Sequence, residues 1–120
     1  MSLEPQHTIV RETANVTILR PTRNLVGDQE TAELEALMAE LNDRGVRNLI
    51  LDLAGVEFLN TTGLMAIVGA YIRFSKRSAR ICICGMQNRV RSVFNAAQFG
   101  LLIPTYDSEE EAIASCTRSR

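Results

Sequence analysis

One short stretch constrains the fold more than any other, the segment "RNLILDL" at residues 47–53. Its consecutive aliphatic residues Leu49, Ile50 and Leu51 would place apolar side chains on both faces of an extended strand. A strand that is apolar on both faces is typical of the interior of a sheet covered by helices. The segment therefore predicts an α/β protein with this strand at the centre of its sheet.

The rest of the chain supplies strands and helices that alternate around this central strand. The periodicity of apolar residues and the turn signals predict further strands at 7–11, 16–20, 79–84 and 101–104, and helices at 30–42, 62–76, 88–99 and 109–114. The first two strands should form a hairpin across "TAN". Each later strand–helix–strand unit should place its strands parallel, so we expect a mixed sheet.

Several residues mark the expected element boundaries. We expect Asp28 and Asn88 to be N-caps, Gly45 to adopt a left-handed conformation after the first helix, and Gly100 to end the third helix. Ser108-Glu109-Glu110-Glu111 has the spacing of a capping box before the last helix. Asp52 ends the central strand, and we interpret it as a cap of the following loop rather than a support for a site.

Length and charge limit the classes of protein to which the chain could belong. With 120 residues, it is expected to form a single domain over 1–120, with about 1–6 and 115–120 frayed. Lys plus Arg total 13 and Asp plus Glu total 14, so no strong field favours nucleic acid or an acidic membrane. The lack of a signal peptide or a bilayer-length apolar run predicts a cytoplasmic protein without direct membrane insertion.

Cysteine and histidine are too sparse to predict a metal site or an active site. Cys82 and Cys84 would share one face of a strand, and we interpret them as small buried apolar residues. Zinc would need ligands at a second spacing, and the single histidine, His7, is distant in sequence. There is neither a plausible Ser-His-Asp set nor a Walker glycine loop. We therefore expect a binding module with no catalytic residue, metal or cofactor, rather than an enzyme.

The heptapeptide "FLNTTGL", Phe58 to Leu64, joins the central strand to the second predicted helix. Locally, Thr61 or Thr62 is expected to cap that helix, and Gly63 would allow close approach of another backbone. One hydroxyl would suffice for a cap, yet there are two. They follow the C-terminal end of a strand, where functional groups gather in α/β sheets. A phosphoryl group on Thr61 would meet free amides and the positive end of the helix dipole.

The longer segment "LILDLAGVEFLNTTGL", residues 49–64, resembles the signature of STAS domains, and especially of bacterial anti-sigma factor antagonists. In that family an aliphatic strand ends in Asp, and after a short loop the motif Asp-Ser-Ser/Thr-Gly-Leu opens a helix. The resemblance covers nearly the whole chain. It implies a mixed sheet of four to five strands with helices packed mainly on one side. Asn60 stands where the family usually has Asp, and Arg23 lies near a position where the family often has Gly.

The resemblance implies a switch that works through protein binding. Family members bind an anti-sigma factor that is also a kinase of the GHKL type. The kinase phosphorylates the hydroxyl residue after the motif Asp, binding is lost, and a PP2C-like phosphatase restores it. By position the acceptor is Thr61, with Thr62 as the alternative. The implied partner-binding residues are Asn60, Thr61, Thr62, Gly63 and Leu64.

A second role remains open from the sequence. Other STAS modules belong to the stressosome or form the cytosolic subunit of a lipid-transport ABC complex, and they act as non-catalytic binding modules. The sequence also leaves monomer and dimer open, and it names neither the kinase nor the sigma factor.

Overall fold

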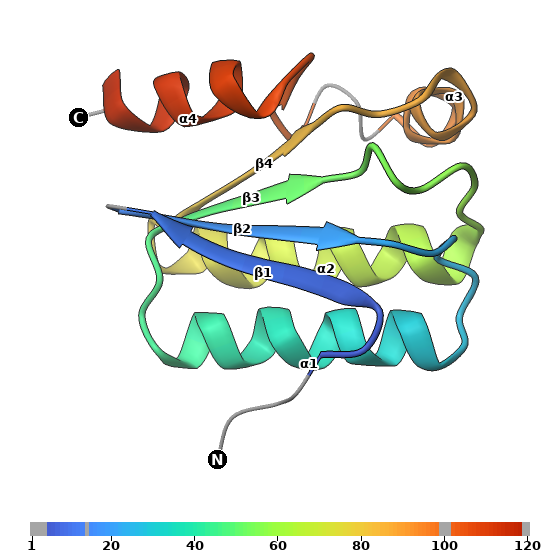
Figure 1. Ribbon diagram of the computed structural model, residues 1–120, viewed down its shortest axis with the longest axis horizontal. Helices are drawn as coiled ribbons and strands as arrows, with labels where there is room; N and C mark the ends of the chain where they lie inside the picture. Colours follow the sequence, from blue (N-terminus) through green and yellow to red (C-terminus); the bar gives the residue numbers. More distant parts are fainter. Residues whose placement is uncertain (1–4, 14, 99–101, 119–120) are drawn as a thin grey trace.

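The computed structural model describes residues 5–13, 15–98 and 102–118, and it shows a five-stranded sheet with helices on both faces (Figure 1). The strands lie in chain order, and β1 is antiparallel to β2 whereas the later neighbours are parallel. The predicted mixed sheet and initial hairpin are therefore confirmed. The elements are β1 (Thr8–Thr13), β2 (Val16–Pro21), α1 (Gln29–Asp43), β3 (Asn48–Asp52), α2 (Thr61–Lys76), β4 (Arg80–Cys84), α3 (Asn88–Ala96), β5 (Thr105–Tyr106) and α4 (Glu109–Arg118).

The apolar core is divided by the sheet into two unequal parts. Leu49 and Leu51 of β3 belong to the larger part, which α1, α2 and α3 cover, whereas Ile50 belongs to the smaller part beneath α4. All three side chains are fully buried. β3 is therefore the central strand, apolar on both faces, that its sequence predicts. The helices lie mainly on one side, as expected for the STAS fold.

The last strand differs from its predicted position. The chain was expected to form a strand at 101–104, but β5 is Thr105–Tyr106. Pro104 has no amide to donate, although its carbonyl accepts a hydrogen bond from the Ile83 amide at 2.9 Å. The strand register with β4 therefore begins at Thr105, directly after this Pro104 contact. Gly100, the expected end of the third helix, lies outside the described residues, and α3 ends at Ala96.

The helix boundaries agree with the predictions only in part. Gly45 has a φ of +81°, as expected after α1. Asp28 is the N-cap residue of α1, but its side chain makes no capping hydrogen bond. Asn88 is not a cap, because Gln87 occupies that position and Asn88 is the first residue of α3. The predictions thus found these helix starts to within one residue but not their capping groups.

The last helix is longer than the sequence predicted. Ser108 Oγ accepts the Glu111 amide at 3.2 Å, which is half of the expected capping box. The Glu111 carboxylate instead accepts the Asp107 amide at 3.1 Å. We expected fraying from residue 115, but α4 continues to Arg118, with Ser115 and Cys116 buried against the sheet. The length of α4 follows from this burial.

Cys82 and Cys84 are buried on the α4 side of β4. Burial raises the pKa of each thiol to about 12, so both are neutral at pH 7. Within the described residues, no three His, Cys, Asp or Glu side chains gather as metal ligands would. None of the helices in that part of the chain combines the length and the hydropathy needed to cross a bilayer.

Candidate functional site

The candidate site lies at the end of the sheet where β3 gives way to α2, at the right of Figure 1. Two loops meet there, one between β2 and α1 and the other between β3 and α2. Leu25 and Leu59 form a parallel bridge between the loops. The Leu25 amide donates to the Phe58 carbonyl at 3.2 Å, and the Asn60 amide donates to the Leu25 carbonyl at 3.1 Å. The loop that carries the motif is therefore held by a second loop.

Asn24 strengthens this junction and was not singled out in the sequence. Its side-chain carbonyl accepts the amide of Glu57 at 2.8 Å and the amide of Phe58 at 3.1 Å. One carboxamide thus fixes the backbone just before the motif. An Asn in a polar turn segment is the only signal of this role in the sequence, and that signal does not name a partner.

Asn60, rather than Thr61 or Thr62, caps α2, so the predicted threonine cap is wrong. Its backbone is extended, and its Oδ1 accepts the Gly63 amide at 3.0 Å. Its Nδ2 donates to the Val26 carbonyl at 2.9 Å. Asn ranks above Thr as an N-cap, and this amide also satisfies a carbonyl in the neighbouring loop. An ionised Asp in its place could accept from Gly63 but could not donate to Val26.

Thr61 and Thr62 are the first two residues of α2, and both are exposed. Among the described residues, neither hydroxyl and neither backbone amide has a hydrogen-bond partner. The Thr62 side chain lies against Gly27, because a β-carbon built at Gly27 would come 3.1 Å from Thr62 Cγ2.

Gly63 and Leu64 lie beneath the surface of the site. A β-carbon on Gly63 would come 2.3 Å from the Leu25 carbonyl oxygen, so only glycine fits. This confirms the close backbone approach that the sequence predicts. Leu64 is 4% exposed and belongs to the larger core. Both residues therefore position the helix start from within.

Asp52 has the structural role that its position predicts. It is buried, and its Oδ1 accepts the Ala54 amide at 2.9 Å at the start of the loop. The Glu109 carboxyl forms a hydrogen bond with Asp52, which raises the pKa of Glu109 above its ordinary value. Arg11 of β1 pairs with the same Glu109. These contacts fix the end of β3 to α4, and no local sequence pattern indicates the part that Glu109 plays in them.

Exposed apolar side chains lie in the loop before Thr61 and along the face of α2 that carries it. Phe58 is 41% exposed on the loop, while Met65 and Ile72 are 49% and 46% exposed on α2. Met65 follows Thr61 by four residues and precedes Ile72 by seven, so all three lie on one face of the helix. We call Phe58, Thr61, Met65 and Ile72 the α2 docking face.

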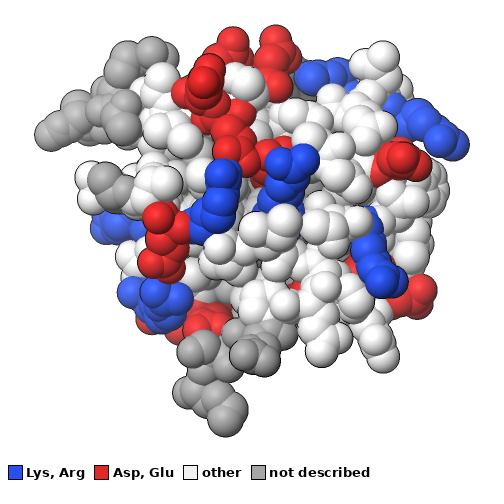
Figure 2. Space-filling model, in the orientation of Figure 1, with Lys and Arg blue, Asp and Glu red and all other residues white. Residues whose placement is uncertain are grey.

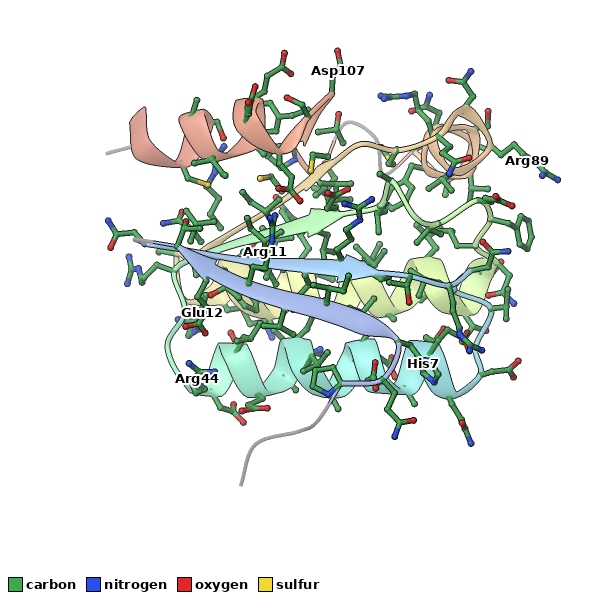
Figure 3. All side chains as sticks on the ribbon, viewed as in Figure 1. His7, Arg11, Glu12, Arg44, Arg89 and Asp107 are labelled. Atoms are coloured by element: carbon green, nitrogen blue, oxygen red, sulfur yellow. The ribbon has the colours of Figure 1, made fainter. Side chains whose placement is uncertain are left out.

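The charges near α3 do not form a binding patch. Arg89 is exposed and points away from the sheet (Figure 3), and Arg91 lies 3.9 Å from Asp107. The view in Figure 2 shows acidic and basic side chains interspersed over its face of the molecule. Such a surface does not favour a highly charged partner.

This fold and this site define a class, an α/β module that presents a neutral, hydroxyl-bearing helix start beside exposed apolar side chains. The family model for the STAS domain matches residues 7–112, and the chain belongs to the STAS domain family.

Named relatives agree with this assignment. BtrV of Bordetella bronchiseptica, provisionally named an anti-sigma factor antagonist, is 26% identical over 93 residues, which is 78% of this chain and 80% of BtrV. A crystal structure of a Thermotoga maritima protein with the same provisional name has a TM-score of 0.84 at 19% identity, covering 90% of this chain and 92% of that one. The anti-sigma factor antagonist SpoIIAA, in its unphosphorylated form, gives a TM-score of 0.74 at 17% identity over 94% and 99% of the two chains. The predicted fold and family resemblance are confirmed.

Proposed function

We propose that this chain is an anti-sigma factor antagonist that binds an anti-sigma factor kinase of the GHKL type and is released when Thr61 is phosphorylated. The observation that carries the proposal is the capping of α2 by Asn60. Because the helix start does not need a threonine cap, the Thr61 hydroxyl is exposed and can be modified without loss of a structural bond.

The α2 docking face is the surface that we propose for the partner. Phe58, Met65 and Ile72 each expose between 41% and 49% of their surface in the free protein. Full burial of one such side chain contributes roughly 1.5–3 kcal/mol. Asn60 and Thr62 would form the polar rim of the interface. Gly63 and Leu64, which lie beneath it, would hold the helix start in place for binding.

The proposed switch acts through charge rather than through a change of fold. Phosphorylation adds about −1.5 to −2 charges at neutral pH. The free amides of Thr61 and Thr62 and the helix dipole can accommodate this charge, and the first turn of α2 contains no acidic residue to repel it. In a desolvated interface the same charge costs several kcal/mol, which corresponds to about a thousandfold loss of affinity.

Thr61 is preferred over Thr62 as the acceptor. Thr61 directly follows Asn60, the position of the family's motif Asp, whereas the Thr62 side chain packs against Gly27. Asn60 in place of the family's Asp supports the docking function, because its amide joins the motif to the Val26 carbonyl. A PP2C-like phosphatase would reverse the modification. The protein itself would act as a non-catalytic module in the cytoplasm.

The test is to isolate the partner and then measure its affinity. Wild-type protein should recover a GHKL-type kinase from native lysate, and the purified kinase should phosphorylate wild type and Thr62→Ala but not Thr61→Ala. By calorimetry, Thr61→Ala should bind like wild type, and Thr61→Glu should bind at least about a hundredfold more weakly. Equal binding by Thr61→Glu and wild type, or recovery of stressosome or ABC-transporter subunits instead, would contradict the proposal.

A further inference from the structure

The two edges of the sheet differ in length and in what they expose. β5 forms one edge and contains only Thr105 and Tyr106. β1 forms the other edge and contains six residues, and within the described part of the chain it pairs only with β2. Ile9 to Thr13 are all exposed along β1, which is the outermost strand at the front of Figure 1. A short edge offers little to another chain, whereas a long one can accept a further strand.

The backbone groups that face the open edge can be identified from the hairpin. The His7 carbonyl accepts the Thr22 amide at 2.9 Å, so the backbone of His7 faces β2. Because these directions alternate along an antiparallel strand, Thr8, Val10 and Glu12 turn their N–H and C=O groups away from β2. Of these residues, Val10 and Glu12 are exposed, whereas Thr8 is buried. Thr8 lies opposite Pro21, which has no amide to share, in agreement with this assignment.

The usual protections of an edge strand are absent or neutralised in β1. Its sequence, TIVRET, contains neither proline nor glycine. Ile9 is 50% exposed and Val10 is 37% exposed, and the two side chains lie on opposite faces. Arg11 pairs with Glu109 of α4, and Glu12 lies 3.3 Å from Arg44 at the end of α1 (Figure 3). The edge charges that would repel another strand are therefore compensated within the molecule.

We propose that β1 pairs antiparallel with β1 of a second copy of this chain, around a two-fold axis at Val10. Val10 then lies opposite Val10 of the second copy, and its outward amide and carbonyl are both satisfied. Thr8 lies opposite Glu12 of the second copy, and Ile9 lies opposite Arg11 of the second copy. This register sets Val10 against Val10 and places no two like charges directly opposite each other.

Charge and hydrogen bonding exclude the neighbouring registers. Opposite residues share a face of the sheet, so the axis can move only by whole residues along β1. An axis at Arg11 or at Glu12 would place that residue opposite its own copy, with like charges in direct contact. An axis at Ile9 would pair Thr8 with Val10, but its outer pairs would need the amide of Gln6, which already donates to Glu33 at 2.6 Å. The axis at Val10 uses only residues of β1.

The pairing leaves the proposed partner site free. β2 separates β1 from β3, which leads into the motif, so the α2 docking face does not take part. An interface of one strand on each side is small, and such interfaces are weak. We therefore expect a dimer that forms reversibly at high micromolar concentration.

Analytical ultracentrifugation of wild type and Val10→Pro tests this dimer. Proline removes the outward N–H of Val10 without breaking a hydrogen bond to β2, and edge strands tolerate proline at such positions. The wild type should show a monomer–dimer equilibrium, and Val10→Pro should weaken dimerisation at least about tenfold. Val10→Thr, which keeps the amide, is the matched control and should remain close to wild type.

Amide hydrogen exchange locates the interface, and a second variant covers a folding failure of Val10→Pro. The amides of Val10 and Glu12 should gain protection as the protein concentration rises, whereas those of Ile9 and Arg11 face β2. Val10→Lys places two cations across the axis and should also weaken the dimer. The proposal is overturned by a wild type that stays monomeric to about 1 mM, by unchanged dimerisation of Val10→Lys, or by protection confined to other surfaces.

Discussion

The N-terminal ends of α1 and α2 lie side by side. A charged side chain accepts backbone amides at the first end, and a neutral side chain accepts one at the second. At the start of α1 the acceptor is a carboxylate, because Glu30 Oε2 accepts the Val26 amide at 2.9 Å and the Asp28 amide at 3.2 Å. At α2 a neutral carboxamide, Asn60, accepts the Gly63 amide. Gly27 of the first start touches Thr62 of the second, so the two ends share one surface.

The two helix starts also differ in how far their side chains are exposed to solvent. Glu30 and Thr31 are 8% and 3% exposed, whereas Thr61 and Thr62 are exposed. Burial alone would raise the pKa of Glu30, but hydrogen bonds from the backbone amides of Val26, Glu30 and Asp28 and from the Thr31 hydroxyl outweigh it and lower the pKa to about 2. A permanent, buried anion stabilises one helix start. The other start is neutral and open, so a charge can be added to it.

The largest effect is expected from Gly63→Ala, which tests how closely the two starts are packed. The new β-carbon would come 2.3 Å from the Leu25 carbonyl oxygen. We expect the free energy of unfolding, measured with urea, to fall by about 4 kcal/mol or more. The matched control is Gly69→Ala in the same helix, where the β-carbon would meet only the Arg73 side chain at 3.7 Å. This control should gain about 1 kcal/mol, and equal costs for both variants would contradict the packing argument.

The next effect is expected from Glu30→Gln, which removes the anion from the α1 start. Because the folded-state pKa is about 2 and the ordinary value is 4.5, ionised Glu30 stabilises the fold above about pH 4.5. That stabilisation is lost as the pH falls from 4.5 towards 2. At pH 7 the variant should lose up to about 3 kcal/mol of unfolding free energy.

The pH dependence separates this effect from a general loss of packing. The difference between wild type and Glu30→Gln should shrink steadily below pH 4.5, as measured by urea denaturation at several pH values. Glu35→Gln changes an exposed carboxylate in the same helix and should alter stability by less than about 0.5 kcal/mol. A difference that stays constant down to pH 2 would show that the charge of Glu30 is not responsible.

The smallest effects come from the hydroxyls, and they compare the two starts directly. Thr31 Oγ1 accepts the Gly27 amide at 2.9 Å and donates to Glu30 at 3.0 Å, so Thr31→Ala should cost about 1–2 kcal/mol. Thr61→Ala removes an exposed hydroxyl without such partners and should cost less than about 0.5 kcal/mol. Thermal and urea unfolding of both variants measure the contrast. A similar loss in both would mean that the Thr61 hydroxyl is engaged in the fold.

The elements that depend on local apolar periodicity could be predicted from the sequence. The run at Leu49 to Leu51 predicted a central strand because a strand covered on both faces buries consecutive aliphatic side chains. The spacing of apolar residues in 30–42 and 62–76 placed α1 and α2 to within one residue at each end. These features depend on a residue's near neighbours in the chain.

The features that depend on contacts between distant segments could not be predicted. The cap is Asn60 rather than Thr61, and the Asn60 side-chain amide also donates to the Val26 carbonyl, 34 residues away. The Asn24 side chain accepts the amides of Glu57 and Phe58, which lie 33 and 34 residues away in the sequence. No local sequence pattern predicts these partners. β5 was misplaced because its pairing with β4 covers only two residues, and Thr and Tyr, although both favour strands, are too short a run to show a pattern.

The unequal edges of the sheet limit how many molecules can join by pairing their strands. Any strand that joins this molecule must do so along β1, because β5 offers two residues at the far side. When two molecules meet along β1, each has used the edge that the other needs, and nothing comparable is left for a third. Assembly by this route therefore ends in a closed pair, and crowded solutions of the protein should not extend into fibrils.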